Sequence, residues 1–299
     1  MTASSHLPYA VFGVTGRTGA ATADALLRAG QAVRVVVRDA AKGRPWVERG
    51  AQVALADLTD LGAMTKALTG VQGAYVVNPQ QYGRDDLFEM ADRIALTTAH
   101  AALEARVPRL VALSSVGADR AGGTGWIGMN RMVEQRLGDA GIPTVFLRAA
   151  YFMENWAPLI AHAVRTGTLP TFLAPPQRAI PMVATVDVGA VAAALLQEEW
   201  TGTGAVTLSG PQDYSPNDVA AIVSAALGKP VDVAVLPEAQ WPQALVDAGF
   251  SNAALAGFIE MTRGLNGQHI DMASDPCAVA RAGTTPLERV VVDLVRRLR

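Results

Sequence analysis

The sequence predicts an α/β protein built around a doubly wound parallel sheet that helices cover on both faces. Short runs rich in β-branched residues alternate with helical patterns through the first half of the chain. A glycine-rich turn, GVTGRTG, directly follows the first of these runs. Parallel neighbours need a crossover of about a dozen or more residues, which a helix usually provides, and such crossovers are right-handed. Together these observations indicate a Rossmann-type domain.

The elements expected in the first half follow from this alternation. We expect strands over 9–14, 32–37, 52–57, 73–78, 109–115 and 143–149. We expect helices over 18–30, 42–49, 60–68, 84–106 and 126–140. Gly30 closes the first of these helices, because glycine readily adopts the backbone conformation that ends a helix.

The alternation loosens after about residue 150. A helix is expected over 151–167, followed by a Pro-rich passage, TLPTFLAPPQRAIPM, with no clear period. Beyond it we expect helices over 187–199 and 216–227, strands over 205–210 and 231–236, and a final helix in VVDLVRRLR. We therefore expect a dinucleotide-binding Rossmann domain over 1–150 and a smaller α+β substrate-binding or lid region over 151–299. Some of the later strands can rejoin the first sheet, which would interleave the two regions.

Composition and charge exclude several classes of protein. The net charge is −2 and the only basic cluster is the C-terminal one, so we expect no nucleic-acid surface. No apolar run approaches the ~18–20 residues of a membrane span, and the N-terminus lacks the features of a secretion signal. Cys277 is the only cysteine, which excludes an internal disulfide and fits a reducing cytoplasm. We expect a cytoplasmic protein that acts on a small molecule, and both a monomer and a homodimer stay open.

The strongest chemical signal is the glycine triplet at the end of the first strand. The tight turn needs a residue without a Cβ, and the middle glycine lets the backbone approach a pyrophosphate. The N-terminus of the helix that follows supplies amide donors and the positive end of a dipole. We assign this loop to cofactor binding through Gly13, Thr15, Gly16, Arg17, Thr18 and Gly19.

Positive charge after the second strand predicts which dinucleotide is bound. Rossmann enzymes that use NAD commonly hold the ribose 2′-hydroxyl with an acid here, whereas those that use NADP place arginine near the 2′-phosphate. Here the strand is followed by Arg38, with Lys42 one helical turn beyond and Arg17 in the glycine loop. Asp39 is expected to point away or to cap the next helix. The pattern therefore favours NADP(H) over NAD(H).

Further cofactor contacts are expected at the carboxyl ends of other strands, where ligands bind in open α/β sheets. Asp57 is placed to receive the adenine amino group, and Leu58 to pack against the ring; an alternative role for Asp57 is a simple helix cap. Asn78 and Pro79 lie where the chain should pass the cofactor's ribose. Ser114 ends the fifth strand and is also assigned to the cofactor.

With these features together, the chain resembles the NmrA-like branch of the atypical short-chain dehydrogenase/reductase superfamily. The matching segments are GVTGRTG, VVVRDAAK, ADLTD, LSSVGA and LRAAYFMENW. The resemblance implies an NADP(H)-binding protein. Members of this branch include quinone and enone reductases, aromatic-ether and isoflavonoid reductases, and regulators that bind NADP and sense redox state.

The resemblance breaks at the helix after the fifth strand. Short-chain dehydrogenases usually place Tyr and Lys four residues apart there, and the Lys lowers the pKa of the Tyr. This chain has Trp126 and Asn130 at those positions. Asn130 can hydrogen-bond a ribose or a substrate, but an amide brings no positive charge. Trp126, Met129, Val133 and Leu137 also form a stripe at helical spacing, which is more often core.

The remaining candidates for chemistry are few. Asn130, Ser115 and Tyr151 are candidate catalytic residues, and Tyr151 is also placed to face the nicotinamide. A loop cap and a core aromatic are the alternative roles of the last two. An apolar substrate pocket is expected from four residues: Tyr82, Trp126, Met153 and Trp156. No spacing of His, Cys or carboxylates suggests a metal site.

Three functions are consistent with these residues. The first is an NADPH-dependent oxidoreductase that transfers hydride to a quinone, an enone or an imine without the usual Tyr/Lys pair. Such acceptors take hydride readily, and water can deliver the proton. The second is a non-catalytic NADP(H) sensor that acts through a protein partner. The third is specialised biosynthetic chemistry on one bound intermediate.

Overall fold

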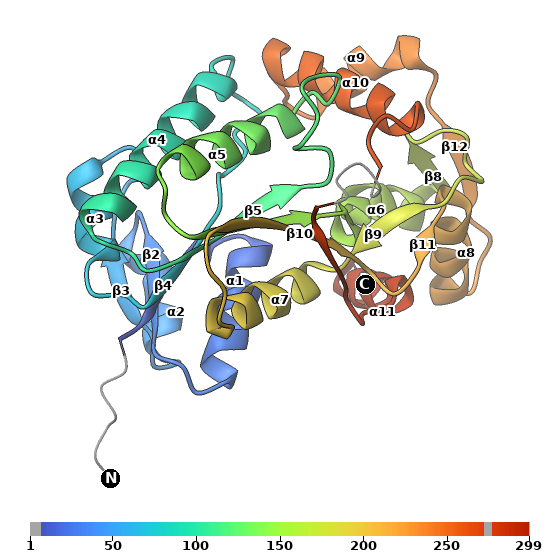
Figure 1. Cartoon of the computed structure of the whole chain (residues 1–299). Helices are drawn as coiled ribbons and strands as arrows, with labels where there is room; N and C mark the ends of the chain where they lie inside the picture. The colour runs from blue at the N-terminus through green and yellow to red at the C-terminus, as the bar shows by residue number, and fades with distance from the viewer. Residues whose placement is uncertain (1–6, 272–276, 299) are drawn as a thin grey trace.

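The computed structural model describes residues 7–271 and 277–298 (Figure 1). An eight-stranded parallel sheet forms its centre, in the order β13-β10-β6-β5-β4-β1-β2-β3. Six of these strands come from the first half of the chain: β1 (Tyr9–Phe12), β2 (Val33–Val37), β3 (Gln52–Leu55), β4 (Gly73–Val76), β5 (Leu110–Ser115) and β6 (Thr144–Ala149). The doubly wound parallel sheet predicted from the sequence is confirmed.

The strand order reverses between β1 and β4. From β1 the chain moves outwards through β2 to β3, and it then returns to place β4 on the other side of β1. Because ligands of open α/β sheets bind outside the carboxyl ends of the strands at such a reversal, this point positions the candidate site.

Helices cover both faces of the sheet, and each face has its own apolar core. On one face lie α1 (Arg17–Arg28), α2 (Ala40–Val47) and α7 (Thr185–Gln197); on the other lie α3 (Leu61–Leu68), α4 (Leu87–Glu104) and α5 (Ile127–Asp139). Val11 and Val35 point to the first face, whereas Ala10 and Val36 point to the second. The central strands are apolar at successive positions because both sides are buried.

The first face needs an unusually close approach between helices. A Cβ added at Gly189 of α7 would lie 2.3 Å from the Cβ of Ala21 in α1. Because residue 189 is glycine, the backbone of α7 can pack directly against the side chain of Ala21 in α1. The contact matters for the site, because α1 begins at the glycine loop.

A smaller lobe, residues 151–183, 213–266 and 287–298, packs beside the sheet (Figure 1). Its strands are β7 (Tyr151–Phe152), β8 (Thr168–Thr171), β9 (Ile180–Val183), β11 (Asp213–Tyr214) and β12 (Asp232–Val235). Its helices are η1 (Met153–Trp156), α6 (Ala157–Thr166), α8 (Pro216–Leu227), η2 (Glu238–Gln240), α9 (Trp241–Asp247), α10 (Asn252–Asn266) and α11 (Leu287–Leu298). The strands form two small sheets, β11-β9-β7 and β12-β8.

Strands from beyond residue 150 also extend the large sheet. β10 (Thr203–Ser209) pairs with β6, and β13 (Val279–Ala282) forms the edge beyond it. The strand expected over 205–210 is therefore real and joins the first sheet. A division into domains near residue 150 stays a prediction.

The structure corrects the sequence analysis mainly in the smaller lobe. The helix expected over 151–167 begins only at residue 157, because β7 and η1 precede it. The Pro-rich passage without a clear period contains β8 and β9. Each of these four-residue strands contains a proline, which argues against a strand in sequence, so neither was predicted, although β9 is the middle strand of its sheet.

Candidate active site

The glycine loop between β1 and α1 is shaped by close contacts. Gly13 has φ of +69°, and a Cβ there would lie 2.4 Å from Cγ1 of Val77. The amide of Gly16 donates to the carbonyl oxygen of Gly13 at 2.8 Å, which closes the turn. A Cβ at Gly19 would lie 2.4 Å from the carbonyl oxygen of Phe12, so this glycine lets α1 start directly against β1.

The N-terminus of α1 is open to a ligand. Its N-cap residue is Gly16, which has no side chain to satisfy the first amides of the helix, whereas a Ser, Thr or Asp would do so. Thr15, Gly16 and Arg17 are exposed, and Thr18 is buried just behind them. Free amides and the helix dipole make this a ready position for a phosphate group.

Three exposed cations belong to the candidate cofactor site. Arg38 follows β2, Lys42 lies in the first turn of α2, and Arg17 begins α1. Within the described residues, none of their side chains makes a hydrogen bond or an ion pair, although Arg38 is close enough to Asp57 to influence its charge. Asp39 caps α2, as expected, because its carboxylate accepts from the amide of Ala41 at 2.8 Å.

Asp57 follows β3 and forms a tight turn with Thr59. Its Oδ1 accepts from the amide of Thr59 at 2.9 Å and from the Thr59 hydroxyl at 2.7 Å. These hydrogen bonds hold the pKa of Asp57 below its usual value, and the nearby charge of Arg38 lowers it further. The alternative role as a helix cap is wrong, because Asp60 caps α3. Leu58 is half-buried and packs against the sheet.

The end of β4 and the start of α5 meet at a small cavity. It measures about 10 Å³ and is lined by Asn78, Pro79, Gln80, Met129 and Asn130. The side-chain amide nitrogen of Asn78 donates to the carbonyl oxygen of Ala91 at 3.0 Å. Its Oδ1 is buried and has no partner among the described residues. The structure thus brings together two residues assigned to the site on separate grounds, Asn78 and Asn130.

Tyr82 and Trp126 also come together, but inside an aromatic cluster rather than around an open pocket. Their rings stack with centroids 3.8 Å apart and 20° between the planes, and Phe250 and Phe258 pack edge-on against Trp126. Nε1 of Trp126 donates to the carbonyl oxygen of Ala254 at 2.8 Å. Burial raises the pKa of the Tyr82 hydroxyl.

The buried stripe on α5 agrees with the packing interpretation of its spacing. Trp126, Met129, Val133 and Leu137 are all buried. Trp126 precedes the helix, and Asn130, which is half-buried, lies one turn further along. Trp126, to which the resemblance assigns the tyrosine position of short-chain dehydrogenases, is thus a core residue.

Tyr151, Met153 and Trp156 belong to the smaller lobe. Met153 and Trp156 are completely buried, and Nε1 of Trp156 contacts Sδ of Met182 at 3.4 Å. This placement does not support their expected use as a lid over an acceptor. Tyr151 keeps part of its surface accessible, but burial raises the pKa of its hydroxyl, which disfavours the charged form that a base requires.

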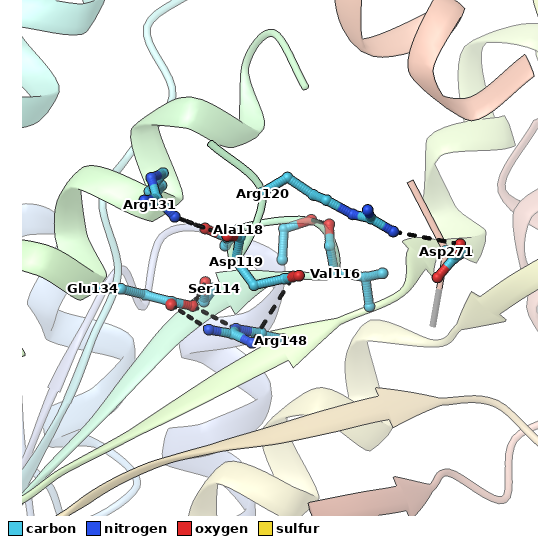
Figure 2. A network of polar contacts seen from close by, with 10 residues as sticks. Ser114, Val116, Ala118, Asp119, Arg120, Arg131, Glu134, Arg148 and Asp271 are labelled. Atoms are coloured by element: carbon cyan, nitrogen blue, oxygen red, sulfur yellow. Dashed lines mark hydrogen bonds and ion pairs between the residues drawn. The ribbon is translucent and has the colours of Figure 1, made fainter. Parts of the chain in front are cut away.

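A largely buried charge network lies between α5 and the ends of β5 and β6, and it was not predicted from the sequence (Figure 2). Glu134 of α5 accepts from Nε and Nη2 of Arg148 at 2.8 and 2.6 Å, and from the Ser114 hydroxyl at 2.6 Å. Arg148 also lies 3.9 Å from Asp119. Ser114 therefore points toward α5, whereas the Ser115 hydroxyl donates to the carbonyl oxygen of Val116 at 3.1 Å. An arginine within the apolar strand PTVFLRA was the available signal for a buried partner.

Two further properties concern the described residues as a whole. They contain no cluster of His, Cys, Asp or Glu that could hold a metal ion. None of their helices is both long and apolar enough to cross a lipid bilayer.

The residues at the carboxyl edge fit a dinucleotide that carries a 2′-phosphate as well as its pyrophosphate. A Cβ at Gly13 or Gly19 would collide with the chain itself, so these glycines allow the tight turn, and the open end of α1 follows it. Arg38 and Asp57 meet where an adenosine 2′-phosphate and an adenine would lie, and Asn78 offers a free acceptor further along the edge. Each of these features suits a different part of NADP(H).

Known proteins share this sequence pattern. A sequence model of the NmrA-like family matches residues 9–278. An NAD(P)H azoreductase of Xenophilus azovorans is 32% identical over 243 residues, which covers 80% of each chain. A (4-alkanoyl-5-oxo-2,5-dihydrofuran-3-yl)methyl phosphate reductase of Streptomyces griseus is 33% identical over 239 residues, which covers 74% of each chain.

For a third relative, a solved structure is available for comparison. Quinone oxidoreductase 2 of Escherichia coli is 26% identical over 242 residues, covering 80% of this chain and 82% of its own. Its structure in complex with NADPH superimposes with a TM-score of 0.81 at 23% identity, over 96% of this chain and 99% of that one. The likeness in structure shows that the two chains share a fold.

Proposed function

Because the chain belongs to the NmrA-like family, we propose that it is an NADP(H)-dependent oxidoreductase that transfers hydride to a small electrophilic acceptor. A quinone, an enone or an imine is the proposed class of acceptor. The observation on which this rests is the cradle at the carboxyl edge of the sheet. There the Gly13–Gly19 loop, the uncapped start of α1 and three exposed cations surround one place.

The cations specify the phosphorylated cofactor. Arg38, Lys42 and Arg17 have no partner in hydrogen bonds or ion pairs among the described residues, so their charges are available to a 2′-phosphate. The only acid beside them at the end of β2, Asp39, is engaged as the cap of α2. An acid that would hold the 2′-hydroxyl of NAD is therefore not offered at this position.

The acceptor class follows from what the site lacks. Trp126 is a buried packing residue and Asn130 is an uncharged amide, so neither supplies an acid of matched pKa. A simple ketone needs such a donor for its developing alkoxide, whereas quinones, enones and imines accept hydride without one. NADPH would supply the hydride when bound, and the chain's part is to orient it and to exclude bulk water. The names of the relatives, an azoreductase, a dihydrofuranone reductase and a quinone oxidoreductase, support electrophilic acceptors.

A stopped-flow experiment tests the reaction directly. NADPH bound to the protein is mixed with a quinone, an enone, an imine and a simple ketone, and absorbance at the nicotinamide band is followed. We expect oxidation by at least one of the first three and none by the ketone. Failure of all three electrophiles to oxidise bound NADPH would contradict the proposal.

The buried Trp126 favours a second candidate function, a non-catalytic NADP(H) sensor. A core tryptophan and an asparagine at the two positions of the usual catalytic pair describe a site that binds the cofactor without turnover. Such a sensor would bind a protein partner differently with NADP⁺ and with NADPH. Pull-downs from cell extract with each form distinguish the two functions, because an enzyme would retain the same partners in both.

A further inference from the structure

The cavity between β4 and α5 has the size of one water molecule. Its volume is about 10 Å³. A space must offer roughly 10–15 Å³ to hold a water, and the water needs two to four polar partners. The cavity is too small for an organic ligand. Three residues with amide side chains, Asn78, Gln80 and Asn130, border it together with Met129 and Pro79.

The Oδ1 of Asn78 needs a donor at this place. It is buried and has no partner among the described residues. The other end of the same amide is fixed, because its nitrogen donates to the carbonyl oxygen of Ala91 at 3.0 Å. Turning the amide over would press its oxygen against that carbonyl oxygen, so Oδ1 must face away from Ala91. Native proteins rarely leave a buried acceptor unpaired, and an ordered water is a common partner.

Asn130 offers the second contact. It borders the same cavity from α5 and is half-buried, and its amide can donate or accept. The residues Pro79 and Gln80, which complete the border, are exposed, so a molecule in the cavity can exchange with solvent. None of the five bordering side chains ionises.

We propose that this cavity binds one water molecule between Asn78 and Asn130, and that this water donates the proton that completes reduction of the acceptor. The second part rests on the proposed function. Asn78 follows β4, the strand beside the reversal of the sheet, and Asn130 has the position that the resemblance to short-chain dehydrogenases assigns to lysine. The water therefore lies at the edge where the nicotinamide end of the cofactor is expected.

The proton step balances without a further reactant. Hydride transfer adds two electrons to the acceptor and leaves a negative charge on it. One O–H bond of the water breaks, and its proton passes to the charged atom. The hydroxide that remains accepts a hydrogen bond from the amide of Asn130 and takes a proton from bulk solvent past the exposed border.

Crystallography tests the water site independently of function. At about 1.5 Å resolution, the cofactor-free protein should show a density peak roughly 2.7–3.2 Å from Oδ1 of Asn78. The peak should disappear in Asn130→Leu, which has a similar shape, and persist in Asn130→Asp, which keeps a polar partner. Asn217→Leu, on the exposed face of α8, is the matched control and should retain it. An empty cavity in the wild type overturns the site, as does a water that persists in Asn130→Leu.

Single-turnover kinetics test the proton role. With an enone as acceptor, Asn130→Leu should reduce the rate of NADPH oxidation at least tenfold, while the calorimetric Kd for NADPH changes less than threefold. A rate equal to that of the wild type overturns the role, and so does a cofactor complex in which a ribose hydroxyl replaces the water. If the wild type holds the water but oxidises no NADPH with any acceptor, the proposed function fails and the water site stands.

Discussion

At the carboxyl edge, the hydrogen bonds that a side chain already makes determine whether it is available to a cofactor. Asp39 and Asp57 are both acids near the predicted adenosine position, but Asp39 caps α2 and Asp57 holds the turn at Thr59. Arg38, directly before Asp39 in sequence, makes no hydrogen bond or ion pair with any described residue. A phosphate would therefore meet an arginine whose charge is not already engaged, so no ion pair has to break before the phosphate binds.

The substitution Arg38→Ala should weaken NADPH binding selectively. A hydrogen bond to a charged group contributes about 1.5–3 kcal/mol, so the Kd for NADPH should rise roughly 10- to 150-fold. The Kd for NADH, which has no 2′-phosphate, should stay within about threefold on the same argument. Isothermal titration calorimetry measures both. Arg44→Ala, which changes an exposed arginine of the following helix α2, is the control and should leave both values unchanged. Equal loss of NADPH and NADH affinity would contradict the assignment.

The Glu134–Arg148 pair should matter more for stability than a surface pair. The two side chains are only 10% and 9% exposed, and Glu134 is closer to the Arg148 guanidinium than Asp119, which lies 3.9 Å away. Glu134→Gln should therefore lower the free energy of unfolding by up to about 3–5 kcal/mol in urea denaturation. The double variant Glu134→Gln/Arg148→Met should lose less than the single Glu134→Gln, because the buried guanidinium that has lost its nearest carboxylate is then removed as well. A double variant that is less stable than Glu134→Gln would contradict this account.

Contacts between residues that are far apart in sequence are the part of the site that could not be predicted. The glycine loop and Arg38 were predictable because each is a local pattern next to a strand end. The cavity between Asn78 and Asn130 requires the register of β4 against α5, which no local pattern gives. Likewise, Arg148 within an apolar strand indicated a buried charge, but the sequence did not show that its partner is Glu134 on α5.

At the scale of helices and strands, α1 links the candidate cofactor site to the packing of the sheet. It begins at the glycine loop, and about one turn further along it contacts α7 through the approach of Gly189 to Ala21. A change in α7 that moves α1 would therefore move the amides that face a phosphate, although no residue of α7 lies in the glycine loop.

The substitution Gly189→Ala should destabilise the protein and weaken NADPH binding together. The added methyl group would lie 2.3 Å from the Cβ of Ala21, so the helices must separate. Overpacking of this kind costs about 1–3 kcal/mol, which urea denaturation would detect. Gly138→Ala in α5 is the matched control, because nothing lies within 4 Å of its added Cβ. The control should be stabilised by about 0.4–1 kcal/mol through the unfolded state. Unchanged stability in Gly189→Ala would show that the helices have room to relax.

Local patterns explain which elements were predictable. The predicted bounds of α8, 216–227, coincide with the observed helix, and a capping box formed by Ser215 and Asp218 marks its start. The strands β8, β9 and β13 were not predicted, because TLPT and IPMV each contain a proline and VARA has only one large apolar residue. Their pairing is set by distant segments, such as β12 for β8 and β10 for β13.

At the scale of the whole molecule, an aromatic cluster joins the sheet domain to the smaller lobe. Tyr82 comes from the loop after β4 and Trp126 from the start of α5, whereas Phe250 and Phe258 come from the segment around α10. The amide of Ser251 donates to the carbonyl oxygen of Tyr82 at 2.9 Å beside this cluster. The packing of Phe250 and Phe258 against Trp126 therefore helps to hold α10 near the carboxyl edge.

The substitution Phe258→Ala should loosen α9 and α10 without unfolding the sheet. It removes ring contacts to Trp126 and to Phe172, whose centroids lie 5.2 and 5.0 Å away. Hydrogen exchange should accelerate about tenfold or more in 241–266, while amides of β1 and β4 keep their protection. Glu260→Ala, an exposed residue of the same helix, is the control. Equal acceleration in the central strands would show that the lobes open as one unit.

The extension of the large sheet by β10 and β13 has a consequence for how this chain can evolve. β6, the last strand of the first half of the chain, pairs with β10 from Thr144 to Ala149. Its outer edge is therefore covered by a strand that lies more than 50 residues later in the sequence. A gene cut after codon 150 would specify a sheet with a bare, aggregation-prone border and no α7 behind α1. A foreign second half would therefore have to bring its own strand to pair with β6 and its own helix to pack against α1.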